Sequence, residues 1–205
     1  MESQTDLPVR QASKLETRNS LLQVALELFV EKGFEATRAS EIAQKAGVAV
    51  GTIYLHFGDK DGLLSSILVD LADNIYIRVK EVYEKHPSAR PEDLARMHIE
   101  QLIQYAEENQ KMAPFVLDYA LSRHPAGAKI IDFMVSQIEE NIRQGQAAGV
   151  YRADIIPLLA ARAEAHMNLG LISWWIEHHD IIAREDVVDT LVKFRLSGLY
   201  AQAKS

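Results

Sequence analysis

The chain has 205 residues, of which 48% are hydrophobic and 25% charged, with a formal net charge of −7 at pH 7. This length and composition support a sizeable core, which excludes disordered and low-complexity classes. The absence of cysteine excludes disulfides, thiolate metal ligands and a cysteine nucleophile. Because the sequence contains no long apolar run and no signal-peptide pattern, we expect a cytoplasmic protein with no membrane partner.

The distribution of charge matters more than its sum. An acidic protein is at first sight a poor ligand for nucleic acid, since phosphate binding depends on lysine and arginine. Residues 1–60 carry seven basic and eight acidic side chains, so nearly all of the net negative charge comes from the residues after position 60. A near-neutral head can still bind DNA if its cations share one face.

The polar residues 1–14 predict a flexible N-terminal arm that carries Arg10 and Lys14. Apolar residues then recur at spacings of three and four, which predicts a helix over about 16–32. Gly33 ends this helix in the left-handed conformation that glycine favours.

Two short helical patterns follow. Thr37 can cap a helix over about 38–45, and Gly47 provides a turn before a second helix over about 50–56. Two short helices separated by a glycine turn are typical of a helix-turn-helix motif.

A long helix is predicted over 59–85, and the last two helices over about 154–178 and 186–201. Arg195 lies on the apolar seam of the last helix. No segment alternates like a strand, so the predicted fold class is all-α. The predicted domains are the flexible arm over 1–14, a helix-turn-helix domain over 15–60, and a larger helical domain over 61–205.

Residues 17–64 carry a characteristic series of positions: Gly33-Phe34, Thr37, Ile42-Ala43, Ala46-Gly47-Val48, Gly51-Thr52-Ile53-Tyr54, His56-Phe57, Lys60 and Leu63. In the order and spacing of these positions, the segment resembles the N-terminal domain of the TetR family of bacterial transcriptional regulators. The resemblance implies a three-helix helix-turn-helix domain followed by a larger helical domain that binds a ligand and dimerises. It further implies a repressor that binds a palindromic operator as a homodimer and is released by a small, hydrophobic effector.

Two positions depart from the family pattern. Ala49 stands where the family often has a serine, so the second short helix lacks a side-chain cap, at a cost of about 1 kcal/mol. Arg38 stands where the family often has threonine or valine. It is either one more contact to DNA or an exposed side chain without a partner.

DNA reading requires side chains that clamp phosphates and others that reach base edges. Gly51 allows close approach to the DNA backbone, and Thr52 offers a hydroxyl and a methyl group. The resemblance and the chemistry of the side chains together predict contacts by Arg10, Lys14, Thr37, Arg38, Ala49, Val50, Gly51, Thr52, Tyr54, His56 and Lys60.

Large, adaptable side chains in the second domain could line an apolar pocket, or they could be ordinary core. The histidines lack metal-ligand spacing, so neither a metal nor a cofactor is predicted. The pocket candidates are Met97, Tyr105, Phe115, Tyr119, Phe133, Met134, His166, Met167 and Trp174.

The last two helices are long and apolar enough to form a four-helix interface with a second copy. The same side chains would look alike in the core of a monomer. The dimer candidates are Leu169, Ile172, Trp175, Leu191, Phe194 and Leu199.

Other functions stay open on the sequence alone. The regulator could be an activator, or it could be controlled by a protein partner. The second domain could be a hydrolase that uses His166 with Ser173 or with a carboxylate, although no nucleophile elbow, phosphate-binding loop or paired carboxylates support it. A helical dimer that has lost DNA binding is a third alternative. The predicted partners are operator DNA, a hydrophobic or aromatic effector, and a second copy of the chain.

Overall fold

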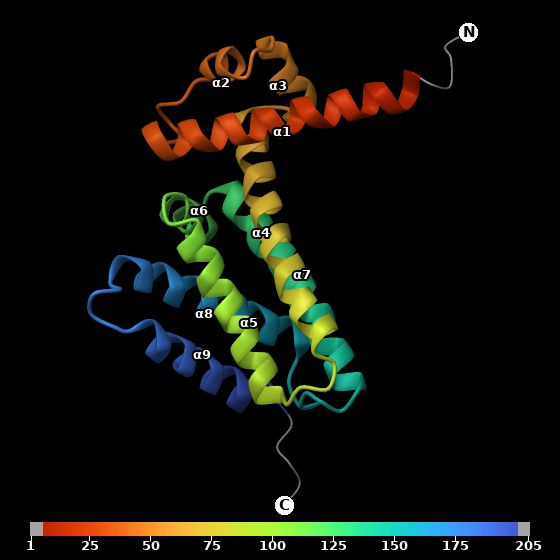
Figure 1. Ribbon diagram of the computed structural model, residues 1–205, viewed down its shortest axis with the longest axis vertical. Helices are drawn as coiled ribbons and strands as arrows, with labels where there is room; N and C mark the ends of the chain where they lie inside the picture. Colours follow the sequence, from red (N-terminus) through yellow and green to blue (C-terminus); the bar gives the residue numbers. More distant parts are fainter. Residues whose placement is uncertain (1–5, 201–205) are drawn as a thin grey trace, which may run out of the picture. The chain divides into compact units, whose positions relative to one another are not determined.

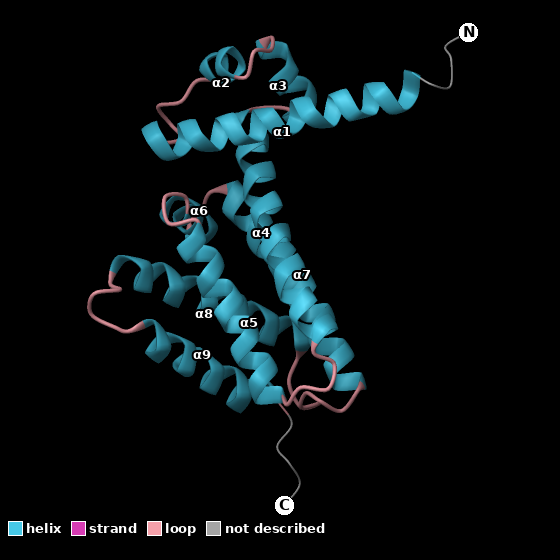
Figure 2. Ribbon diagram, in the orientation of Figure 1, coloured by secondary structure: helices cyan, strands magenta, loops and turns pink. Residues whose placement is uncertain are grey.

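The computed structural model describes the backbone of residues 6–200 and the side chains of residues 12–200. Within this part of the chain the protein is helical, with a single isolated bridge between Tyr151 and Tyr200, which confirms the all-α prediction (Figures 1 and 2). No described helix is long and apolar enough to cross a membrane. The helices are α1 (Asp6–Lys32), α2 (Ala39–Lys45), α3 (Val50–Phe57), α4 (Lys60–Lys85), α5 (Pro91–Glu108), α6 (Ala113–Leu121), α7 (Pro125–Ala147), α8 (Pro157–Glu177) and α9 (Arg184–Leu199).

The chain divides into two compact units, with the boundary inside α4 between Ile67 and Leu68. Most predicted helices agree with the observed ones to within a few residues, but α1 begins at Asp6 instead of near Glu16. Residues 6–14 are therefore helical and do not form the predicted arm. Pro8 is compatible with this, because proline in the first turn of a helix gives up no intrahelical hydrogen bond.

The first unit is built around one apolar core to which all four of its helices contribute. Each helix supplies side chains that are fully removed from solvent, which is the main favourable contribution to its folding. These side chains are Leu21, Ala25 and Phe29 of α1, Ile42 of α2, Ile53 of α3, and Leu63 and Leu64 of α4.

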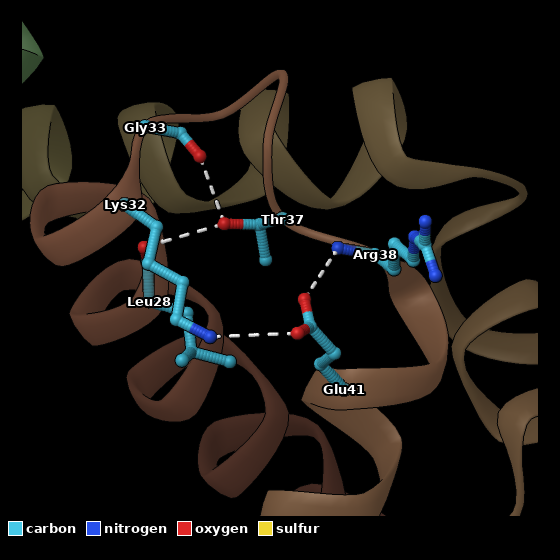
Figure 3. A network of polar contacts seen from close by, with 6 residues as sticks. All are labelled: Leu28, Lys32, Gly33, Thr37, Arg38 and Glu41. Carbon is cyan, nitrogen blue, oxygen red and sulfur yellow. Dashed lines mark hydrogen bonds and ion pairs between the residues drawn. The ribbon is translucent and has the colours of Figure 1, made fainter.

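Thr37 anchors the loop between α1 and α2 from inside the unit (Figure 3). Its side chain is 1% exposed, and its hydroxyl donates to the carbonyl oxygen of Gly33 at 2.8 Å. The carbonyl oxygen of Leu28 lies 3.3 Å from the same hydroxyl. The Gly33 carbonyl directly follows α1, where carbonyl groups have no intrahelical partner. Thr37 therefore closes the end of α1 and does not cap α2 as predicted.

The cap of α2 is formed by Arg38 and Glu41 (Figure 3). The Arg38 backbone N–H donates to Oε2 of Glu41 at 3.0 Å, and Lys32 Nζ lies 3.4 Å from Oε1 of the same carboxylate. These hydrogen bonds lower the pKa of Glu41. A glutamate three residues after the cap is the reciprocal half of a capping box.

The turn between α2 and α3 depends on Gly47, whose φ is +71°. Among the described residues only glycines adopt positive φ, as steric repulsion at Cβ leads one to expect. Ala49 then begins α3 without a side-chain hydrogen bond, which confirms the missing cap.

The second unit combines the C-terminal part of α4 with α5 to α9. Helix α8 packs against α6, α7 and α9, and α5 packs against α9. The predicted apolar seam of the last helix is confirmed, since Val188, Leu191 and Leu199 of α9 are buried. The side chains that α8 and α9 bury against one another are no longer available at the surface.

Gly62 should be indispensable for the junction of α3 and α4. A Cβ atom there would lie 1.9 Å from the carbonyl oxygen of Phe57, a backbone atom that cannot swing away. We expect Gly62→Ala to destabilise the protein by about 1–3 kcal/mol in thermal unfolding followed by circular dichroism. The control is Gly51→Ala, where a Cβ meets no atom within 4 Å. The control should be neutral or stabilising by up to about 1 kcal/mol, and equal melting temperatures for the two variants would refute the assignment.

Candidate nucleic-acid interface and ligand cavity

Helix α3 presents an unusual outer face. Tyr54 is 54% exposed, Leu55 is 78% exposed and Val50 is 37% exposed, although Ile53 beside them is fully buried. Several large apolar side chains gathered on one short helix indicate a surface that contacts a partner. Val50 and Tyr54 were predicted contacts, but Leu55 was not. Its signal was present in the sequence, since a residue two positions after the buried Ile53 lies on the opposite side of a helix.

The first turn of α3 adds polar groups and space to this face. Thr52 is half-buried, Gly51 is exposed, and a Cβ at Gly51 would meet nothing within 4 Å. Ala49 is also exposed, and His56 is half-buried near the other end of the helix. In helix-turn-helix proteins the N-terminal residues of the second helix contact base edges in the major groove. The reading face of α3, defined as Val50, Gly51, Thr52, Tyr54 and Leu55, has this arrangement.

The structure gives Thr37 and Lys60 internal partners. Thr37 is buried with its hydroxyl engaged, which contradicts its predicted contact with DNA. Lys60 Nζ donates to the carbonyl oxygens of Phe34 at 2.8 Å and Thr37 at 3.1 Å, and it lies 4.2 Å from the centre of the Phe34 ring. Lys60 therefore fastens the α1–α2 loop to the start of α4. Its predicted phosphate contact remains a prediction, for which the ammonium has a third N–H.

The remaining cations of the first unit differ in their surroundings. Lys45 Nζ lies 3.0 Å from Oε2 of Glu27 and thereby lowers the pKa of that carboxyl. Arg38 and Lys14 are exposed and stay predicted phosphate contacts. The side chain of Arg10 lies outside the described residues.

The second unit contains a cavity of about 160 Å³, bounded by helices α4 to α8. This volume is far above the ~10–15 Å³ that accommodates one water molecule. Among the predicted pocket residues, Tyr105, Phe133 and Met134 line it. The predicted pocket residues that do not line the cavity are Met97, Phe115, Tyr119, His166, Met167 and Trp174.

The misplaced pocket candidates have other neighbours. Phe115 and Tyr119 pack on each other with ring centres 4.9 Å apart, and Trp174 stacks on His178 at 4.5 Å. Trp174 is nearly half exposed, on the outer side of α8. Periodicity identifies apolar stripes, but it does not distinguish a stripe that faces a cavity from one that faces a neighbouring helix or solvent.

A buried polar cluster adjoins the cavity. Arg195 of α9 forms an ion pair with Glu164 of α8, and both side chains are more than nine-tenths buried. Arg195 Nη2 donates to the Tyr83 hydroxyl at 3.2 Å, and that hydroxyl lies 3.0 Å from Nδ1 of His98. Burial, with Arg195 close by, lowers the pKa of His98 well below its usual range, so the ring is neutral at pH 7.

Most of the predicted dimer contacts are wrong for a physical reason. Ile172, Trp175, Leu191 and Leu199 are buried within one protomer, so they cannot meet a second copy without unpacking it. Leu169 lines the cavity, whereas Phe194 is 62% exposed and remains a candidate.

Comparisons with known proteins agree with this architecture. Residues 21–67 match the family model described as bacterial regulatory proteins, tetR family. The chain is 26% identical to the transcriptional repressor KstR2 of Mycolicibacterium smegmatis over 73% of each protein. A putative tetR family regulator from Shewanella has the same fold, with a TM-score of 0.72 at 23% identity over 91% of this chain and 99% of that one. The regulator FadR from Bacillus subtilis, solved with stearoyl-CoA, has a TM-score of 0.66 at 19% identity over 87% and 97%.

Breaking the buried ion pair should be costly. Arg195→Met leaves the Glu164 carboxylate buried without a counter-charge, and we expect a loss of about 3–5 kcal/mol in urea unfolding. The double variant Glu164→Gln/Arg195→Met removes both charges and should be more stable than the single variant. If the stability loss of the double variant equals the sum of the losses of Glu164→Gln and Arg195→Met, the two residues are not coupled.

Proposed function

Because this chain is a transcriptional regulator of the TetR family, we propose that it represses its target genes as a homodimer bound to a palindromic operator. A small, largely apolar molecule that enters the cavity of the second unit releases it from DNA. The observation that carries the proposal is the exposed, mainly apolar reading face on the second helix of a helix-turn-helix. The relative KstR2, named a transcriptional repressor, supports the sign of the response. The protein would act in the cytoplasm, where operator DNA lies.

The reading face has the chemistry for base recognition in the major groove. Val50 and Leu55 offer methyl groups to the C5-methyl of thymine, and the Thr52 hydroxyl can bond to a base edge or a phosphate. Tyr54 extends its hydroxyl toward the sugar-phosphate wall. Arg38 and Lys14 supply charge to fix the register on the duplex.

A dimer would place two reading faces on one operator, with half-sites about 34–36 Å apart. The surface that we assign to the interface is the outer side of α8 and α9, where Trp174 and Phe194 are exposed. Gly170 of α8 and Gly198 of α9 leave open space beside their backbones, which allows close helix approach. A two-fold contact uses the same patch on both copies.

The cavity would couple an effector to DNA affinity. A ligand can change operator affinity only by the difference in its affinity for two states of the protein, commonly about 1–3 kcal/mol. The related fold of FadR, which was solved with stearoyl-CoA, supports an effector with an apolar chain.

Selection of random duplexes by the purified protein at about 150 mM salt tests the proposal, since non-specific phosphate binding is weak there. We expect enrichment of a palindrome, and a reporter gene placed behind it should be repressed. Activation of the reporter would show an activator instead. Failure to enrich any motif would refute the proposed reading face.

Leu55→Ala should weaken binding to the selected operator about tenfold in fluorescence anisotropy, because it removes an apolar contact to bases. Melting should be unchanged, since the Leu55 side chain is 78% exposed. The matched control is Leu121→Ala at the end of α6, which makes the same change on an exposed residue of the second unit. Equal operator affinities for the two variants would remove Leu55 from the reading face.

Phe194→Glu should convert the dimer to a monomer in analytical ultracentrifugation, because it puts a charge at the proposed interface. Operator affinity should fall at least about 100-fold with the loss of the second half-site. Leu121→Glu serves as the control and should remain a dimer. A dimeric Phe194→Glu protein would show that the copies meet elsewhere.

A further inference from the structure

The cavity offers no counter-charge to a ligand. Its lining contains no aspartate, glutamate, lysine or arginine. The imidazole of His98 belongs to the lining, but burial and Arg195 keep it neutral. An ionised carboxylate or phosphate that entered this space would lose its hydration without an opposite charge in return. The lining therefore selects a neutral ligand.

Asn168 provides an unsatisfied hydrogen-bond acceptor in the wall of the cavity. It is 5% exposed and belongs to the lining, on the same side of α8 as Ala165 and Ile172. Its Oδ1 is buried and, among the described residues, has no hydrogen-bond partner. A buried amide oxygen without a donor is costly in a folded protein. A ligand that brings an O–H or N–H group would satisfy it.

His98 provides a donor in the wall of the same cavity. The Tyr83 hydroxyl accepts from Arg195, so its own proton is available to Nδ1 of His98, 3.0 Å away. The remaining proton of the neutral ring then resides on Nε2. The nearest carboxylate oxygen, Oε1 of Glu164, is 4.0 Å from Nε2, which is beyond hydrogen-bond distance. Nε2–H can therefore donate to a ligand.

We propose that the effector is a neutral, mainly apolar alcohol whose hydroxyl donates to Oδ1 of Asn168 and accepts from Nε2 of His98. A hydroxyl is the smallest group that satisfies an acceptor and a donor at once. The apolar remainder of the molecule packs against the aliphatic and aromatic lining, which includes Leu71, Ile75, Val116 and Phe133. Met112 and Met134 can adjust to its shape. This inference rests on the proposed function, because it names the ligand class of the same cavity.

Isothermal titration calorimetry of the full chain at pH 7.5 tests the alcohol directly. The probes are octanol, decanol and dodecanol, each with its methyl ether and its carboxylate of equal chain length, and decanoyl-CoA. The ether can accept but not donate, and the carboxylate is charged. We expect at least one alcohol to bind about tenfold or more tightly than its ether, its carboxylate and decanoyl-CoA.

The variant Asn168→Leu keeps the size of the side chain and removes the acceptor. It should lower the affinity for the best alcohol about tenfold and leave the affinity for the ether unchanged. The control, Asn74→Leu, makes the same change at an exposed residue of α4 outside the lining and should bind the alcohol within about twofold of the parent chain. The ratio of the alcohol affinity to the ether affinity is measured on the unmodified chain. The inference can therefore be tested even if the Asn168→Leu protein misfolds.

Tighter binding of a carboxylate or of decanoyl-CoA, equal binding of alcohol and ether, or no binding of any alcohol would each overturn the inference. Operator binding of the ligand-free protein is measured separately. If the ligand-free protein binds the operator but no alcohol binds as expected, the proposed regulatory function is retained and only the proposed ligand class is wrong. If the operator is not bound, the proposed function fails whatever the calorimetry shows.

Discussion

The second unit is organised by the need to neutralise one buried guanidinium. Arg195 cannot lose its charge at any physiological pH, so its burial among apolar helices requires a partner of opposite charge and further acceptors. Glu164 supplies the charge, and the hydroxyl of Tyr83 accepts a hydrogen bond. With His98 bonded to Tyr83, four helices, α4, α5, α8 and α9, meet at this one cluster.

The cavity inherits its chemistry from that cluster. The charges of Arg195 and Glu164 satisfy each other outside the cavity lining, and what faces the cavity is the neutral edge of the network. His98 stays uncharged because it is buried next to a cation. Asn168, one turn along α8 from Glu164, adds a second neutral polar group. A cavity bordered by a strong ion pair can thus remain selective for uncharged molecules.

The first unit solves a different problem, which is to hold a short helix with an apolar outer face. Helix α3 has eight residues and no side-chain cap, so its own hydrogen bonds are insufficient to keep it folded. Ile53 anchors it in the core, and the loop that precedes α2 is fixed by Thr37 and Lys60. Because these internal contacts provide the stability, Tyr54 and Leu55 are left exposed for a partner.

Several features followed from the sequence alone. The spacing of apolar residues identified most of the helices, and Gly47 identified the turn, because a left-handed backbone favours glycine wherever it occurs. The resemblance over residues 17–64 indicated the family. The resemblance and the side-chain chemistry predicted Val50, Thr52 and Tyr54 as DNA contacts, and helical periodicity relative to Ile53 predicted that Thr52 and Tyr54 face outward.

Other features were decided by tertiary packing. Local pattern could not reveal that Thr37 and Lys60 point inward, since their partners are carbonyl groups at the end of another helix. Trp175 and Leu191 have the same apolar character as an interface residue, and only the contact of α8 with α9 shows that they are buried. Arg195 was visible on an apolar seam, but Glu164 and Tyr83, 31 and 112 residues away, became its partners only through folding. Sequence periodicity fixes which side of a helix is apolar, whereas the choice among core, cavity and interface depends on what the other helices bring to that side.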